Sequence, residues 1–111
     1  LLRRPGKRSL PIIRVGKLAF DVAARTARSE GHSIELTRRE ADLLELLMRR
    51  AGSVVRRSTI EEALYRFDEI VTPNAVEAIV SRLRHKLSEA DNPGSLITVR
   101  GMGYLLKESG H

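Results

Sequence analysis

The sequence predicts an α+β fold with an N-terminal antiparallel sheet, three helices and a C-terminal β-hairpin. Short apolar segments separated by turn residues occupy residues 12–36, which favours strands. Apolar residues then recur at helical spacing over residues 37–90, behind sequences that cap helix N-termini. Two further strand-like segments flank Gly101-Met102-Gly103. A chain of 111 residues has room for one such domain.

Residues 1–11 are expected to be an inter-domain linker, and residues 12–109 to be the domain itself. The linker contains two prolines, one glycine and four basic residues, and it has no apolar periodicity. Its basic side chains are either solvated or in contact with the phosphates of a nucleic acid. The chain does not begin with methionine, which indicates a piece of a longer protein.

Strand-like segments alternate with turn signals in the first part of the domain. Two segments surround Gly16-Lys17 and two surround Ser29-Glu30-Gly31, so hairpin pairing is expected. The expected strands are residues 12–15, 18–22, 25–28 and 33–36.

Two helices are expected next. Residues 37–40, Thr-Arg-Arg-Glu, form a capping box, and Gly52 is a suitable C-terminal stop for the first helix. Residues 58–61, Ser-Thr-Ile-Glu, repeat the capping signature and predict a short second helix. Its buried face is expected to hold Ile60, Ala63, Leu64 and Phe67.

The third helix is expected over residues 73–88, with Thr72 as N-cap and Pro73 in the first turn. Its apolar stripe is formed by Val76, Val80, Leu83 and Leu87, and the opposite side by Asn74, Ala78, Ser81, Arg82 and His85. A short helix followed by a longer one with small and polar outer residues is how helix-turn-helix proteins place a helix in the major groove. Asparagine can pair with adenine there, and arginine with guanine. A plain amphipathic helix with a solvated outer face is the alternative.

A β-hairpin is expected to close the domain, with strands at residues 97–100 and 104–107. The glycines between them are not expected to form a phosphate-binding loop, because such loops lead into a helix and a strand follows here. Arg100 projects from this hairpin, and its guanidinium suits a narrow minor groove. A surface salt bridge is the alternative role for Arg100.

The net charge of +6 is weak evidence for a nucleic-acid partner because of where it lies. Residues 1–17 hold six basic residues and no acidic one, so residues 18–111, with 14 basic and 14 acidic residues, sum to zero. Local clustering in the last third is more informative. Basic residues there outnumber acidic ones, at Arg82, Arg84, Lys86, Arg100 and Lys107.

The sequence argues against catalysis, metal binding and RNA binding. It has no cysteine, and His32, His85 and His111 are dispersed, so neither a catalytic triad nor a metal-ligand set is expected. No cofactor and no membrane segment are expected. An aromatic content of 4% leaves few platforms for stacking RNA bases.

From about Ile12 to Lys107 the sequence resembles the effector domain of OmpR/PhoB-type response regulators. The resemblance lies in three blocks in the right order: Leu-Thr-Arg-Arg-Glu at residues 36–40, Asn-Ala-Val-Glu-Ala-Ile-Val-Ser-Arg-Leu-Arg-His-Lys-Leu at residues 74–87, and Ile-Thr-Val-Arg-Gly-Met-Gly-Tyr at residues 97–104. It implies a winged helix-turn-helix fold with a four-stranded N-terminal sheet. It also implies sequence-specific DNA binding and transcription regulation in the cytoplasm, within a two-component phosphorelay.

The resemblance also implies site residues. Family contacts with DNA carry over to Asn74, Ile79, Arg82 and Arg84 in the helix and to Thr98 and Arg100 in the hairpin, and the full predicted set adds Ala78, Ser81, His85 and Lys86. Relatives often carry an aromatic residue or histidine at the position of Ile79, where an aliphatic side chain offers only apolar contact, for example to a thymine methyl. The loop at residues 66–71, with Asp68 and Glu69, corresponds to one that touches RNA polymerase, although a solvated connection is the alternative.

The expected partner is promoter DNA with direct repeats, bound head to tail by two copies that are monomers when isolated. A sensor kinase would act through the missing receiver domain. Two alternatives stay open: a receiver-less or membrane-tethered regulator that uses the same domain, and a winged helix that only binds protein.

Overall fold

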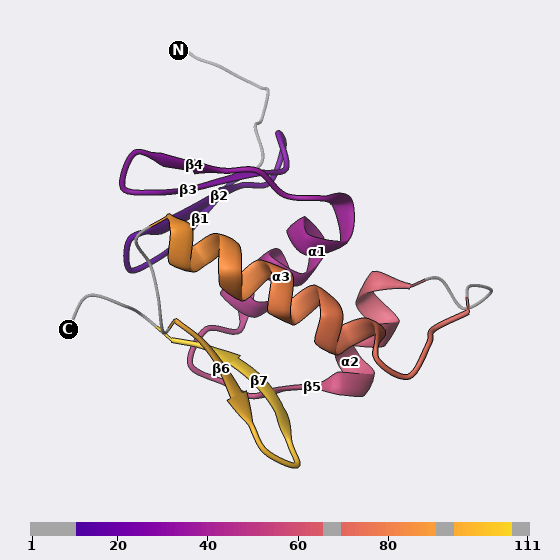
Figure 1. Cartoon of the computed structure of the whole chain (residues 1–111). Helices are drawn as coiled ribbons and strands as arrows, with labels where there is room; N and C mark the ends of the chain where they lie inside the picture. Colours follow the sequence, from indigo (N-terminus) through magenta and orange to yellow (C-terminus); the bar gives the residue numbers. More distant parts are fainter. Residues whose placement is uncertain (1–10, 66–69, 91–94, 108–111) are drawn as a thin grey trace.

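The predicted strands and helices follow one another in the predicted order, and one short strand that was not predicted lies between the first two helices (Figure 1). The computed structural model describes residues 11–65, 70–90 and 95–107. Its elements are β1 (Ile12–Val15), β2 (Leu18–Asp21), β3 (Thr26–Ser29), β4 (His32–Ile34), α1 (Arg38–Arg49), β5 (Val55–Arg56), α2 (Arg57–Leu64), α3 (Ala75–Glu89), β6 (Leu96–Val99) and β7 (Gly103–Leu106). Most of the predicted linker, the loop residues Phe67, Asp68 and Glu69, and the helix end predicted at residues 91–94 lie outside the described residues.

The first four strands form an antiparallel sheet in the order β1-β2-β3-β4, which confirms the predicted hairpins. One cross-strand row, Ile13, Phe20, Ala27 and Ile34, faces the core. Its partners on the other face include the exposed Arg14 and Arg28. The alternation of apolar and polar residues thus gives the sheet one buried and one solvated side.

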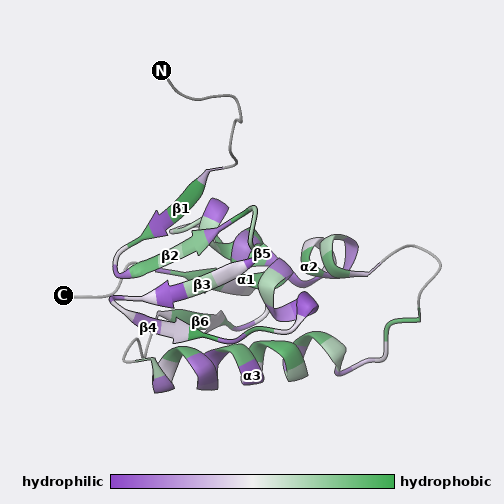
Figure 2. Ribbon diagram, turned by 90° about the horizontal axis from the view of Figure 1, so that it is seen from above, coloured by the Kyte–Doolittle hydropathy of each residue, from purple (hydrophilic) through white to green (hydrophobic). Residues whose placement is uncertain are grey.

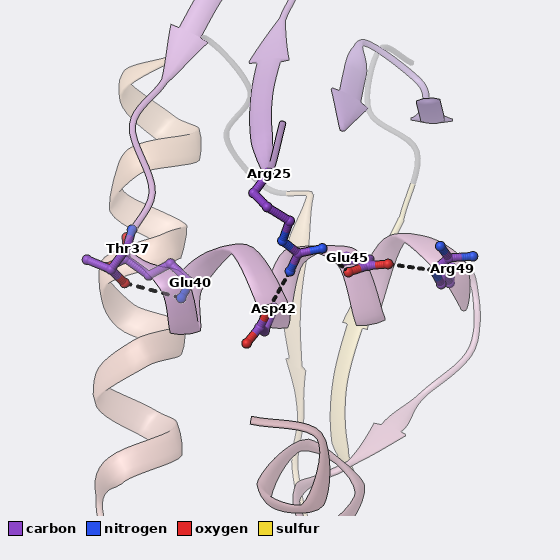
Figure 3. Close-up of polar contacts among 6 residues, drawn as sticks. All are labelled: Arg25, Thr37, Glu40, Asp42, Glu45 and Arg49. Atoms are coloured by element: carbon purple, nitrogen blue, oxygen red, sulfur yellow. Dashed lines mark hydrogen bonds and ion pairs between the residues drawn. The ribbon is translucent and has the colours of Figure 1, made fainter. Parts of the chain in front are cut away.

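Arg25 lies in the turn between β2 and β3, and its side chain forms ion pairs with α1 (Figure 3). Its backbone has a φ of 58°, so β3 begins at Thr26 and not at residue 25 as predicted. Its guanidinium contacts both Asp42 and Glu45 of α1, and it also lies 5.1 Å from the centre of the Phe20 ring. A side chain with three such partners ties the sheet to the helix layer.

The predicted capping box starts α1. The Thr37 hydroxyl accepts a hydrogen bond from the Glu40 amide at 3.2 Å, and the Thr37 amide donates to the Glu40 carboxylate at 3.0 Å. Both bonds satisfy amides that have no partner inside the helix. After α1, Gly52 adopts a φ of 86° and donates its amide to Leu106 at 2.9 Å, so the end of α1 is joined to the last strand.

The start of α2 differs from the prediction. The helix begins at Arg57, and its N-cap Arg56 makes no side-chain capping bond, so the signature at residues 58–61 does not cap it. The reason is β5, which pairs with β7 and ends immediately before the helix. Ile60 and Leu64 are buried as predicted, whereas Ala63 is exposed.

The start of α3 differs in the other direction and lies later than predicted. Asn74 is the N-cap, without a side-chain capping bond, and Ala75 is the first helical residue. The Ala75 amide donates to the Thr72 carbonyl at 3.1 Å, so Thr72 and Pro73 belong to a turn before the helix. Figure 2 shows α3 along one edge of the molecule, where hydrophilic and hydrophobic residues alternate along its length.

The last two strands form the predicted hairpin, called the wing below, in a second sheet of order β5-β7-β6. Each wing strand begins one residue earlier than predicted, at Leu96 and Gly103. Gly103 lies opposite Arg56 with a φ of 154°, and a Cβ there would come within 2.1 Å of the Val55 carbonyl oxygen. Only glycine permits this close approach of two backbones.

One mainly aliphatic core joins the two sheets and the helices. α1 contacts β1, α2, α3 and β7, so it is the central element. Among the core side chains are the fully buried Phe20, Leu43, Ile60, Leu83 and Leu106. The core therefore fixes α3 and the wing relative to the same central helix.

Candidate nucleic-acid interface

The outer face of α3 is open to solvent. Val76, Val80, Leu83 and Leu87 are buried as predicted. The residues predicted on the opposite side, Asn74, Ala78, Ser81, Arg82 and His85, are all exposed. The helix thus presents hydrogen-bonding and small side chains outward and hides its apolar stripe.

Arg84 connects α3 to the wing. Its Nε donates to the Leu96 carbonyl at 3.2 Å, and its second terminal nitrogen donates to the Thr98 hydroxyl at 2.7 Å. The wing therefore lies directly beside α3 (Figure 1). Both side chains belong to the predicted DNA-binding set, and in this structure they bind each other.

The contact between Arg84 and Thr98 should be measurable in the free domain. Arg84→Gln and Thr98→Val should each lower the free energy of unfolding, and a double-mutant cycle should give a coupling of about 1 kcal/mol, because a hydrogen bond to an exposed charged group is modest. Urea denaturation of the four proteins measures it. A coupling indistinguishable from zero would mean that this contact does not fix the wing.

Arg100 and its neighbours form the exposed tip of the wing. Arg100 has no ion-pair partner among the residues that the structure describes, so the salt-bridge alternative finds no support there. Gly101 turns the chain with a φ of 76°, and the Met102 amide donates to the Val99 carbonyl at 3.0 Å. The glycines lead into strand β7, which confirms a hairpin turn and not a phosphate-binding loop.

Ile79 does not lie on the outer face. Only 5% of its surface is exposed, and it packs in the core with Val76 and Leu83. These residues are separated by three or four positions, which places Ile79 at the edge of the apolar stripe. Its side chain therefore offers at most a narrow apolar edge, and the expected contact of Ile79 with DNA stays a prediction.

Lys86 is already engaged within the domain. Its ammonium lies 2.5 Å from a carboxylate oxygen of Glu40, a residue that is 2% exposed, and the Lys86 side chain is itself only 30% exposed. A buried carboxylate needs such a partner. The structure thus gives Lys86 a partner on α1, where the prediction assigned it to DNA.

The environment of Glu40 combines opposing effects. Burial acts to raise the pKa of this carboxyl group. Hydrogen bonds from the Lys86 ammonium and the Thr37 amide, together with the positive charges of Lys86 and Arg82, outweigh burial and hold the pKa below its usual value. Glu40 therefore stays ionised at neutral pH and contributes no free negative charge beside α3.

Arg57 joins α2 to the start of α3, a role that the sequence reasoning missed. Its guanidinium lies 3.0 Å from Glu77 and 3.3 Å from Glu61, and it also donates to the Pro73 carbonyl. The two helices are thus held together by a side chain in addition to their apolar contacts. A basic residue at the start of a helix, with one acid four residues later and another in the next helix, is the only sequence signal for it.

His85, a further residue of the predicted DNA-binding set, has a partner within α3. His85 lies 3.2 Å from Glu89, one turn further along α3. Across the part of the chain that the structure describes, no group of three or more His, Cys, Asp or Glu residues could hold a metal ion. None of the helices in that part combines the length and apolarity that a membrane crossing requires.

Comparison with known proteins assigns the family. Residues 31–106 match the family model described as "Transcriptional regulatory protein, C terminal". The chain belongs to this family. It is a family of OmpR/PhoB-type transcription regulator domains and not a class of enzymes, which confirms the resemblance and the winged-helix fold inferred from the sequence.

Relatives of this transcriptional regulator domain agree with the assignment. The probable transcriptional regulatory protein y4xI of Sinorhizobium fredii is 43% identical over 107 residues, which cover 96% of this chain and 47% of that protein. QseB of Escherichia coli O157:H7 is 44% identical over 108 residues, covering 97% and 48%. The chain thus spans about half the length of the curated relatives it matches.

Solved structures of family members share the fold. The DNA-binding domain of CpxR from E. coli superposes with a TM-score of 0.76 at 31% identity, over 91% of this chain and 100% of that one. The RstA DNA-binding domain of Klebsiella pneumoniae, solved in complex with the RstA box, gives 0.76 at 29% identity, over 88% and 98%.

Proposed function

We propose that this domain binds specific double-stranded promoter DNA, with α3 in the major groove and the wing on the flanking backbone and minor groove. One observation carries the proposal: the exposed outer face of α3 lies beside the wing, to which Arg84 bonds it. The family assignment and the complex of RstA with its box support it. A helix flanked by a hairpin is the arrangement by which such domains contact DNA.

The exposed residues suggest the division of roles. Ala78 and Ser81 are small, so the backbone of α3 can approach base edges. Arg82 can donate two hydrogen bonds to guanine, and Asn74 can pair with adenine at the start of the helix. Arg100, at the tip of the wing, carries a flat guanidinium that suits a narrow minor groove.

The larger context is also part of the proposal. The domain is the effector half of a cytoplasmic response regulator, and phosphorylation of a receiver domain by a sensor kinase brings two copies together head to tail on direct repeats. The isolated domain is then a monomer that binds one half-site weakly. The loop that contains Asp68 and Glu69 contacts RNA polymerase.

Two substitutions test the assignment of the contacts. Arg82→Ala and Arg100→Ala should each weaken binding to duplexes selected from randomised DNA by about 10- to 100-fold, because a good contact of this kind is worth about 1 to 3 kcal/mol. Arg28→Ala, on the exposed face of the N-terminal sheet, is the matched control and should leave affinity unchanged. Fluorescence anisotropy titration measures all three.

The pattern of effects separates the alternatives. If neither α3 nor wing substitution changes affinity while all variants stay folded, the assigned roles are wrong. If the unaltered domain selects no DNA sequence at all, a winged helix that binds only protein takes the place of this proposal.

A further inference from the structure

A groove runs along the side of α3 that faces the start of α1. Its volume is about 670 Å³, and the first turn of α1 lines it on one side. Asn74, Ala78 and Arg82 of α3 line it on the other, and Tyr65 also contributes to its lining. Because these three α3 residues are also the predicted base-contacting residues, the groove continues the outer face of α3 without a break.

The groove and the wing lie on opposite flanks of α3. Two positions along a helix turn by about 200°, so Arg82 and Arg84 point to opposite sides of it. Arg84 bonds to the wing, and Arg82 lines the groove. A helix inserted in the major groove is bordered by one DNA strand on each flank. The wing can contact one of these DNA strands, and the groove is the surface that the other strand can contact.

The charge of the groove fits a polyanion. Arg38 is exposed, and it has no ion-pair partner among residues 11–65, 70–90 and 95–107. Arg39 lies 4.0 Å from the centre of the Tyr65 ring, which holds its guanidinium at the groove. Among the described residues that line the groove, the one acid is Glu40, which is buried and bonded to Lys86. The other charged side chains among those described residues are positive.

We propose that this groove binds the phosphate backbone of the DNA strand on the flank away from the wing, with Arg38 contacting a phosphate. The inference rests on the proposed function, since it takes α3 to lie in the major groove. Arg38 comes from α1, so it adds the central helix to a surface otherwise made by α3 and the wing. The contact is with the backbone, so it raises affinity for every sequence to the same extent.

The test compares Arg38→Gln with Arg49→Gln in the 111-residue chain. Both variants lose one positive charge from α1, but Arg49 lies in the last turn and pairs with Glu45, far from the groove. Binding to a selected duplex and to an unrelated duplex is titrated over a range of salt concentrations. For Arg38→Gln we expect a loss of about 3- to 10-fold on both duplexes and a slope of log affinity against log salt reduced by about 1. Arg49→Gln should change neither.

A second measurement locates the phosphate. Single methylphosphonate substitutions, which remove one backbone charge each, are placed in turn along both strands of the selected duplex. One position on the strand away from the wing should weaken binding by the unaltered domain and leave binding by Arg38→Gln unchanged.

The outcomes distinguish this inference from the proposed function. The unaltered domain can bind its selected duplex while Arg38→Gln keeps both affinity and salt slope. In that case the groove does not contact DNA, and an acidic protein segment becomes the candidate occupant. The proposed function then still stands. If the unaltered domain binds no duplex, the proposed function itself fails. A thermal unfolding curve of Arg38→Gln that matches the unaltered domain ensures that any loss reflects contact and not folding.

Discussion

Gly103→Ala should lower the free energy of unfolding by about 3 kcal/mol or more, which is a large part of the stability of a domain of this size. The new Cβ would lie 2.1 Å from the Val55 carbonyl oxygen, a distance that no relaxation of one side chain can relieve, because the obstacle is backbone. The φ of 154° adds strain for any residue with a side chain. β5 and β7 must separate, and the wing then loses its attachment to the start of α2.

Gly101→Ala is the matched control for this substitution. Gly101 lies two residues away at the tip of the wing, has a φ of 76°, and would place its Cβ in open space. Only the backbone strain remains, so about 1 kcal/mol is expected. Urea denaturation followed by circular dichroism measures both. Equal effects of the two substitutions would mean that strain, and not the approach of Val55, makes Gly103 necessary.

Lys86→Met should destabilise the domain by about 3 kcal/mol at pH 7, because it leaves the Glu40 carboxylate buried without its ammonium partner. Methionine keeps most of the apolar length of the lysine side chain, so loss of packing contributes little. In a Glu40→Gln background, where no charge is buried, the same substitution should have a much smaller effect. Thermal or urea unfolding of the four proteins measures the difference.

The effect of Lys86→Met should also depend on pH. In the unaltered domain the pKa of Glu40 is lowered on folding, so its contribution is present above the pKa of the unfolded chain and is lost as pH falls through the folded value. Without Lys86, burial favours the protonated acid, which needs no ammonium. The difference in stability between the two proteins should therefore be largest near neutral pH and narrow below about pH 4. A difference that stays constant from pH 7 to pH 3 would contradict this account.

Local signals in the sequence predicted most of the fold. The capping box at Thr37, the hairpin at Gly16 and the apolar stripe of α3 depend on residues within one or two turns of each other, and the structure confirms all three. The outward position of Asn74 and Arg82 followed from the same helical spacing. Local periodicity is sufficient where one face of an element is buried and the other is free.

Contacts between distant segments could not be predicted in the same way. β5 has two residues, and it exists because β7 pairs with it from far along the chain, Val55 with Tyr104 and Arg56 with Gly103. That pairing moved the start of α2, and it explains why the capping signature at Ser58 failed. The Lys86 and Glu40 pair also joins two helices far apart in sequence, so the sequence showed Lys86 only as part of a basic cluster, and it was assigned to DNA. The roles of the remaining predicted site residues stay predictions.

The placement of the two tyrosines gives the domain built-in optical reporters. The sequence has no tryptophan and only two tyrosines, so tyrosine emission comes from Tyr65 and Tyr104 alone. Tyr65 lies against Arg39 and lines the groove, and Tyr104 is buried in the wing. Replacing either ring by phenylalanine leaves a single emitter on one flank of α3. Events on the two flanks can then be followed separately, without attaching a dye.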